Sequence, residues 1–226
     1  AISPAIYKSL PFDTMRDFIP VTQLVGTSTV LVANTKLPAR TAKELIAVAK
    51  EKPGKPNYGM PGVGNSLHLT MEMFKRAAGI DIQAIPYRGD APLNTALLAR
   101  EVDVAVVPLV AILPHVQSGA VRALAVNSAQ RSPLLPNVPS VAEQGYPGFD
   151  YTLWVGLWGP AKIPADIAAK INKDVNAALA SPDLRERLTK LGTVPGNLTI
   201  PQFTDFVRKE IEETKTILQA AGIKPQ

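Results

Sequence analysis

Short apolar runs rich in β-branched residues alternate with helical patterns over much of the chain. The runs are STVLVAN (28–34), IQAIPY (82–87), VDVAVVPL (102–109), VRALAVNS (121–128) and YTLWVGLWG (151–159). Between the first four runs, apolar residues recur three or four positions apart, which is the spacing of an amphipathic helix. The segments with this spacing are 41–52, 66–79, 92–101 and 111–119. This alternation predicts an α/β architecture with a largely parallel sheet flanked by helices.

After Gly159 the pattern changes to three successive helices, 164–181, 182–192 and 201–222. Each opens on a proline, which is favoured in the first turn of a helix, and the last two end at a glycine. At 226 residues the chain is long enough for one large domain or two of ordinary size.

Residue usage limits the chemistry that the chain can perform. It has no cysteine, which excludes disulfides, thiolate zinc sites and cysteine nucleophiles. With two histidines, any metal site would need carboxylates, and we predict neither a metal nor a cofactor. The net charge of +5 comes from scattered residues without interleaved aromatics, so nucleic acid is not an expected partner.

Membrane segments are not expected either. No apolar run reaches the roughly 18 residues needed to span a bilayer, and the N-terminus lacks the basic and apolar regions of a signal peptide. If the protein is exported, its signal is expected to be already removed.

The stretch YGMPGVGNSLHLTMEMFKRAAG (58–79) places three glycines and an asparagine ahead of a helical pattern. A glycine-rich turn at a helix start leaves backbone N–H groups unpaired at the positive end of the helix dipole, which suits a carboxylate or phosphate. Asn65 and Ser66 can add side-chain hydrogen bonds. The same residues are also typical of an ordinary turn and N-cap, and that interpretation stays open.

A second glycine turn occurs in PYRGDAPLNTALL (86–98), where a strand again leads into a helix. Two helix starts at neighbouring strand ends would converge on one crevice. Asp90 is most simply the N-cap of this helix, with a ligand ammonium as the alternative partner. Tyr87 and Arg88 are candidate pocket residues, although Arg88 is also compatible with a solvent-exposed position.

Candidate catalytic residues are few. Ser66 and His68 lie two positions apart in GNSLH, which is not the G-x-S-x-G pattern of a nucleophile elbow, and no acidic third member is evident. We expect His68 to pack or hydrogen-bond at the helix start, and Asp103 to satisfy backbone donors. Trp154, in LWVGLWG, either closes over a ligand or packs in the core.

Several segments together resemble one family. ISPAIYKSLPFDTMRDFIPV, IPYRGDAPLNTALLAREVDVAV and WGPAKIPADIAAKINKDVNAAL are similar to the Bug-type substrate-binding proteins of tripartite tricarboxylate transporters. The most specific element is RSPLLPNVPSVAEQGYPGF (131–149), and the resemblance covers essentially the whole chain.

The resemblance implies a periplasmic, type II-like binding protein with two α/β lobes around a cleft. Residues 1–33 and 152–226 would form the first lobe, and residues 34–151 the second. Such proteins capture a small organic acid and deliver it to a membrane permease. Family members usually carry a further segment before the point where this sequence starts, so the first lobe is expected to be incomplete, with apolar surface open to association.

The resemblance also implies which residues contact the ligand, because family members hold a carboxylate with the glycine-rich loop and the Tyr-basic-Gly turn. In this loop Val63 and Leu67 replace polar side chains, which favours a less polar acid or an amide-bearing solute over citrate. The predicted ligand contacts are Gly64, Asn65, Ser66, Leu67, His68, Tyr87, Arg88, Gly89, Asp90, Ala91 and Trp154.

We therefore predict a solute-binding protein that performs no chemistry. Two alternatives remain at this point. One is a ligand-sensing or interaction module for a membrane partner. The other is a hydrolase that uses Ser66 or His68.

Overall fold

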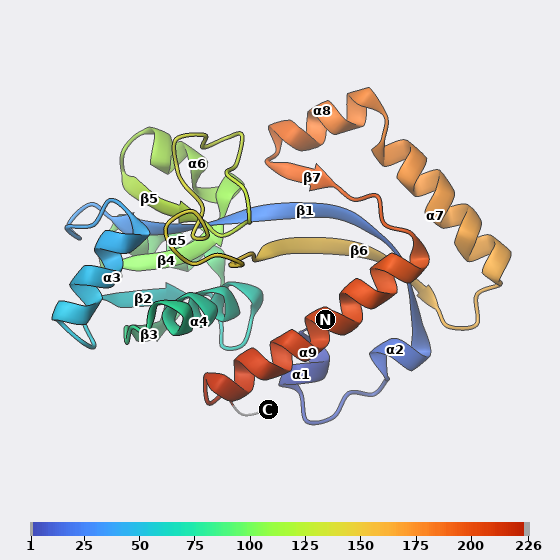
Figure 1. Cartoon of the computed structure of the whole chain (residues 1–226), viewed down its shortest axis with the longest axis horizontal. Helices are drawn as coiled ribbons and strands as arrows, with labels where there is room; N and C mark the ends of the chain where they lie inside the picture. Colours follow the sequence, from blue (N-terminus) through green and yellow to red (C-terminus); the bar gives the residue numbers. More distant parts are fainter. Residues whose placement is uncertain (1, 224–226) are drawn as a thin grey trace. The chain divides into compact units, whose positions relative to one another are not determined.

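The computed structural model describes residues 2–223 and divides into two compact units (Figure 1). Residues 28–152 form one unit, here called the continuous unit. The described residues within 1–27 and 153–226 form the other, here called the discontinuous unit. The boundaries between the predicted lobes lie at 33/34 and 151/152. The boundaries between the two compact units lie inside strand β1 (Phe18–Asn34) and at the start of β6 (Thr152–Pro160).

The continuous unit is built on a sheet with the strand order β3-β2-β4-β1-β5. Its strands besides β1 are β2 (Asn57–Met60), β3 (Gln83–Pro86), β4 (Val104–Pro108) and β5 (Val121–Val126). β2 is parallel to β3 and β4, whereas β1 is antiparallel to β4 and β5. Four of the five strands therefore share one direction. The largely parallel α/β sheet is confirmed, with β1 as the antiparallel member that makes it mixed.

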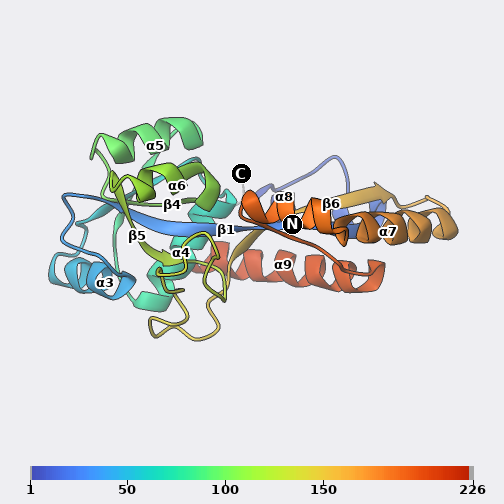
Figure 2. The same cartoon turned by 90° about the horizontal axis from the view of Figure 1, so that it is seen from above.

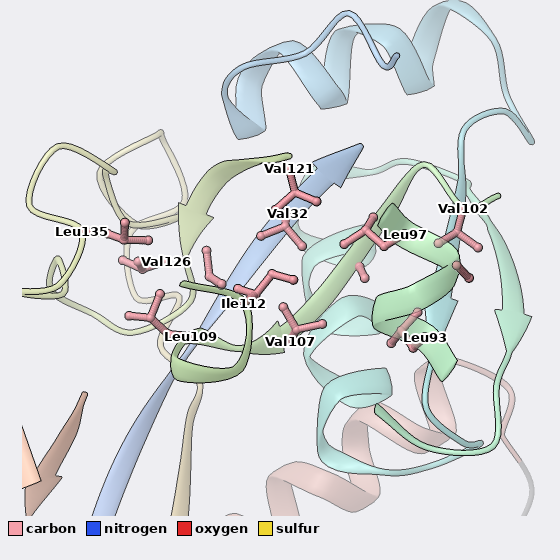
Figure 3. Packing of buried hydrophobic residues seen from close by; sticks show 13 residues of the cluster. Val32, Leu93, Leu97, Val102, Val107, Leu109, Ile112, Val121, Val126 and Leu135 are labelled. Atoms are coloured by element: carbon pink, nitrogen blue, oxygen red, sulfur yellow. The ribbon is translucent and has the colours of Figure 1, made fainter. Parts of the chain in front are cut away.

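Helices cover both faces of this sheet (Figure 2). α5 (Asp90–Leu98) and α6 (Leu109–Gln117) lie on one face, and α3 (Ala42–Glu51) and α4 (Ser66–Ala78) lie on the other. Figure 3 shows the core under α5 and α6, where Val32 and Val107 of the sheet meet Leu97 and Ile112 of the helices. Because both faces are covered, β4 and the last six residues of β1 are buried nearly throughout, as the apolar runs in the sequence indicated, whereas the edge strand β3 is partly exposed.

Gly59 in β2 brings α5 close to the sheet. A Cβ atom there would collide with Leu93 Cδ1, and would lie 3.3 Å from Val102 Cγ2 and 3.4 Å from Tyr87 Cε2. Leu93 is fully buried. The missing side chain in β2 therefore leaves the space that α5 fills.

Gly59→Ala is expected to lower the free energy of unfolding by about 1–3 kcal/mol, since it overpacks this contact. Urea unfolding followed by circular dichroism measures the effect. Leu93→Ala should cost about 2–5 kcal/mol alone. In the double variant the new methyl occupies space that Leu93 vacated, so the two losses should not add. Additive losses would show that Gly59 does not pack against Leu93.

The discontinuous unit contains the first part of β1, with β6 and β7 (Thr193–Pro195), and five helices among its described residues. The helices are α1 (Ser3–Ile6), α2 (Thr14–Asp17), α7 (Ala165–Leu179), α8 (Pro182–Lys190) and α9 (Ile200–Ala220). β7 pairs antiparallel with β1 through Val25, Gly26 and Thr27. The three predicted C-terminal helices correspond to α7, α8 and α9.

A hydrophobic cluster of the discontinuous unit is centred on α9. Phe203, Val207 and Ile211 are the buried residues of this cluster, and Trp154 and Trp158 of β6 pack against them. Both indoles meet the Phe203 ring edge-on, with centroids 5.4 and 5.9 Å away. α9 starts with a capping box, in which Thr199 and Gln202 exchange hydrogen bonds with each other's backbone N–H groups.

Candidate functional site

The two glycine turns leave the continuous sheet at the same edge. β2 and β3 are parallel neighbours whose last residues, Met60 and Pro86, are paired, and the Tyr87 N–H donates to the Met60 carbonyl over 2.8 Å. Each strand then enters a turn that leads into a helix. Ligands of open α/β sheets bind at the carboxyl ends of the strands, so this edge is the candidate site.

The first turn ends in a well-formed helix start. Gly64 has a φ of 75°, in the left-handed region that favours glycine. Asn65 is the N-cap of α4, and its side-chain oxygen accepts the N–H of His68 over 2.9 Å. Among residues 2–223, none accepts a hydrogen bond from the backbone N–H of Ser66 or Leu67. These donors stay available at the positive end of the α4 dipole.

The second turn depends on Gly89, whose φ of 105° and ψ of 179° lie in a region that only glycine adopts readily. Gly89 itself is the N-cap of α5 and Asp90 is the first helical residue, so the prediction of Asp90 as N-cap is wrong by one position. Glycine supplies this N-cap conformation, and α5 has no side-chain cap among the described residues. Within the described chain, the N–H groups of Gly89, Asp90 and Ala91 have no recorded acceptor.

The two helix starts differ in charge. α4 has no acidic residue in its first turn, whereas α5 has the exposed Asp90. Arg88, also exposed, precedes Asp90 by two residues. The N-terminus of α4 is therefore the more favourable of the two for a carboxylate. Tyr87 is partly buried, and this burial raises the pKa of its hydroxyl.

Val63 and Leu67, the two apolar residues of the first turn, differ in their exposure to solvent. Val63 is 50% exposed, whereas the Leu67 side chain is buried at 7% exposure. Leu67 thus offers a ligand its backbone N–H and packs its side chain into the core. Val63 adds apolar surface beside the turn.

His68 is buried beneath the first turn. Its Nδ1 accepts the N–H of Gly64 over 2.9 Å, and its Nε2 lies 3.8 Å from Glu72 Oε1. Glu72 in turn accepts hydrogen bonds from the Tyr58 hydroxyl over 2.6 Å and from Lys75 Nζ over 2.8 Å. The expectation that His68 hydrogen-bonds at the helix start agrees with this geometry.

The sequence analysis missed Tyr58 and Glu72, which contact His68, and Lys75, which binds Glu72. A signal existed for two of them, because Glu72 and Lys75 follow His68 at the helical spacing of four and seven residues. Tyr58 lies in β2, whose residues are not among the apolar runs that predicted strands.

No recorded hydrogen bond joins Ser66 to His68 among the described residues. A serine nucleophile needs a base within hydrogen-bonding reach, and His68 Nδ1 is already engaged by Gly64. Asp103 fills the structural role expected of it, since its Oδ2 accepts the N–H of Asn57 over 3.0 Å.

Trp154 lies in the discontinuous unit, where its Nε1 donates to Glu210 Oε2 over 3.2 Å. Burial raises the pKa of this carboxyl above its ordinary value, and the hydrogen bond from Trp154 opposes the shift only in part. Phe203 and Phe206 pack edge-on against the indole. This geometry favours the packing alternative for Trp154, and its contact with a ligand stays a prediction.

Residues 1–223 match the sequence model of TctC, the tripartite tricarboxylate transporter family receptor. The chain belongs to the TctC family. Among curated relatives, it is 33% identical to a UPF0065 protein of Bordetella pertussis and 32% identical to BugT of the same organism. These matches cover 100% and 99% of the chain, and 69% of each relative. The resemblance to Bug-type proteins is confirmed.

Solved structures agree with this membership and confirm the fold class. This TctC-family chain superposes with a TM-score of 0.87 and 31% identity on Rpa4515 of Rhodopseudomonas palustris, a structure with adipate. On the periplasmic binding protein BugD the TM-score is 0.83, with 29% identity. On MatC from R. palustris, with bound malate, it is 0.79, with 27% identity. The matches cover 96–100% of this chain and 75–76% of the others.

The described part of this TctC-family chain offers neither a metal cluster nor a membrane-spanning helix. No group of three or more His, Asp or Glu side chains in it is placed to hold a metal ion. No helix in it has both the length and the apolar character needed to cross a bilayer.

Proposed function

We propose that this chain is the periplasmic solute-binding component of a tripartite tricarboxylate-type transport system. It captures a small organic acid without chemical change and presents it to a membrane permease. Membership of the TctC receptor family and the likeness to BugD, Rpa4515 and MatC support this proposal. The cleft between lobes that the resemblance implies remains a prediction.

The observation that carries the proposal is the pair of helix starts at one sheet edge. Ser66 and Leu67 on α4, and Gly89 to Ala91 on α5, have backbone N–H groups without an acceptor among the described residues. Hydrogen bonds from such donors to a carboxylate are charge-assisted and are strengthened by the helix dipole. We assign a ligand carboxylate to the N-terminus of α4, with donors from the second turn completing its coordination.

The remainder of the ligand is proposed to be largely apolar. Val63 exposes an apolar side chain beside the first turn, and the side chain of Leu67 is buried and offers no polar group there. An oxygen-rich acid such as citrate would leave hydroxyl or carboxylate groups without partners there, which is costly. An aliphatic dicarboxylate such as adipate, which the similar Rpa4515 structure contains, or an amide-bearing acid fits these residues better.

Isothermal titration calorimetry with adipate, malate and citrate at pH 7.5 tests this proposal. We expect adipate to bind most tightly and citrate most weakly. One unpaired polar group on citrate costs about 1–3 kcal/mol, which is roughly a 5- to 150-fold difference in Kd. Bound ligand at a hundred times Kd should also stabilise the folded chain by about 2.7 kcal/mol.

Two results would contradict the proposal. If none of the three acids binds, the carboxylate assignment fails. If citrate binds more tightly than adipate, the argument from Val63 and Leu67 is wrong. Mass spectrometry of the recovered ligand is the control for the absence of chemistry, because a hydrolase using Ser66 or His68 would return a changed compound from an ester or amide analogue.

A further inference from the structure

His68 and Asn65 hold the first turn by a reciprocal pair of hydrogen bonds. Asn65 Oδ1 accepts the N–H of His68, and His68 Nδ1 accepts the N–H of Gly64, each over 2.9 Å. The arrangement resembles a capping box shifted by one residue, with a histidine nitrogen as the returning acceptor. The backbone on both sides of the N-cap is thereby tied to one imidazole ring.

The surroundings of His68 define which nitrogen carries its proton. Since Nδ1 accepts from Gly64, the proton of the neutral ring lies on Nε2, which faces Glu72. The charged and titratable groups recorded around the ring are Glu72 and Lys75 of α4 and Tyr58 of β2, whose ring stacks on the imidazole at 6.3 Å. Among the described residues, Lys75 and Tyr58 both bind the Glu72 carboxylate, so its charge is partly compensated.

We propose that His68 is a positioning residue for the ligand site, which holds the free N–H groups of Ser66 and Leu67 in place by accepting the Gly64 N–H. This inference rests on the proposed function, because it assigns the turn a ligand. His68 itself does not touch the ligand in this proposal. Its side chain is 6% exposed and its Nδ1 is already engaged.

Protonation of His68 removes this acceptor. The protonated ring carries a hydrogen on both nitrogens, so Nδ1–H would face the Gly64 N–H, donor against donor. Burial lowers the pKa of His68 below its ordinary value of 6.5, and Glu72 only partly opposes this shift. The neutral ring therefore prevails above pH 6.5, and the contact is lost as the pH falls through the lowered pKa.

The first test needs no ligand. In 15N-labelled protein, we expect the Gly64 amide resonance to titrate together with the His68 ring, with a common midpoint below 6.5. His68→Asn is the matched variant, because its Oδ1 occupies the place of Nδ1 but does not titrate. Its Gly64 amide should stay protected and unchanged from pH 7.5 to 5.5. If the chemical shift of the Gly64 amide does not change while His68 titrates, the proposal is wrong.

The second test measures the Kd for adipate at pH 7.5 and at a pH one unit below the His68 midpoint that the first test gives. In the unsubstituted chain the affinity should fall about tenfold more than in His68→Asn, which corrects for protonation of the ligand. His68→Leu should bind about tenfold more weakly at both values, and His68→Asn should recover most of that loss. If His68→Leu fails to fold, the comparison with His68→Asn still decides.

The two tests separate this inference from the function on which it rests. Equal pH profiles for the unsubstituted chain and His68→Asn overturn the positioning role while leaving binding intact. If adipate does not bind at all, the proposed function fails, and the Gly64 resonance still shows whether His68 holds the turn.

Discussion

Gly89→Ala is expected to weaken adipate binding by about 10- to 150-fold. The φ of 105° and ψ of 179° at Gly89 are not available to alanine without a cost of about 1–3 kcal/mol, so the backbone must rotate. Rotation redirects the N–H groups of Gly89 and Asp90. Losing one hydrogen bond to a charged ligand costs about 1.5–3 kcal/mol, which corresponds to this change in Kd. Calorimetry at pH 7.5 measures it.

A steric explanation for such a result is excluded by the surroundings of Gly89, since a Cβ atom there would meet nothing within 4 Å. The effect would therefore come from backbone conformation alone. Gly79→Ala is the matched control. Gly79 follows the C-terminal end of α4 with a φ of 60°, and a Cβ atom there also meets nothing within 4 Å.

The control variant should lose about 1–2 kcal/mol of stability, the usual cost of a left-handed alanine, and keep the Kd of the unsubstituted chain. Equal losses of affinity in both variants would indicate general destabilisation. Unchanged affinity in Gly89→Ala would remove the second turn from the site and leave the α4 start as the whole of it.

The helix starts of this site could be predicted because their determinants are local. The asparagine at 65 and the glycines before it define the start of α4 within a few residues. Asp90 was misplaced by one position because both Gly89 and Asp90 are acceptable N-cap residues. The conformation of Gly89 decides which of the two residues is the N-cap, and this conformation cannot be read from the local sequence.

A strand was expected before the first glycine turn, but the residues of β2 could not be assigned from their own pattern, because the determinant of β2 is distant in the sequence. NYGM has only four residues, and its glycine weakens the strand pattern. Gly59 is explained by Leu93, which lies on the helix after the next strand. Without an assignment of these four residues, neither the register that pairs Met60 with Pro86 nor the position of Tyr58 beside His68 can be derived from the sequence.

β1 shows the same dependence on distant partners. The sequence predicted a strand over 28–34, yet β1 begins at Phe18 and includes Pro20 and Gly26. Its middle residues, Val25 to Thr27, pair with β7, its later residues pair with β4 and β5, and β6 also pairs with it. The antiparallel direction of β1 also depends on how the chain connects the strands, and an apolar run does not indicate the direction of its strand.

Phe203→Ala is expected to lower the free energy of unfolding of the discontinuous unit by about 3–5 kcal/mol. The ring is fully buried and belongs to a core of three buried residues on α9. It also covers Gly156 of β6, where a Cβ atom would collide with the Phe203 ring. No side chain at position 156 can fill the space that the ring leaves. Two aromatic contacts to the indoles are lost as well.

Intrinsic fluorescence gives this prediction a specific readout. The chain has two tryptophans, Trp154 and Trp158, and both lie in the discontinuous unit against Phe203. Their emission during urea unfolding therefore reports on this core. Phe203→Leu is the matched control, because it keeps much of the apolar volume and should lose clearly less stability.

The difference between the two Phe203 variants separates cavity formation from the loss of aromatic contacts. If Phe203→Ala and Phe203→Leu lower the fluorescence midpoint equally, the loss comes from the aromatic contacts and not from the cavity. If neither variant shifts it, α9 does not supply the core of this unit. We expect the urea midpoint of Phe203→Ala to lie well below that of Phe203→Leu. This result would show that the Phe203 ring, packed on Gly156, joins α9 to β6.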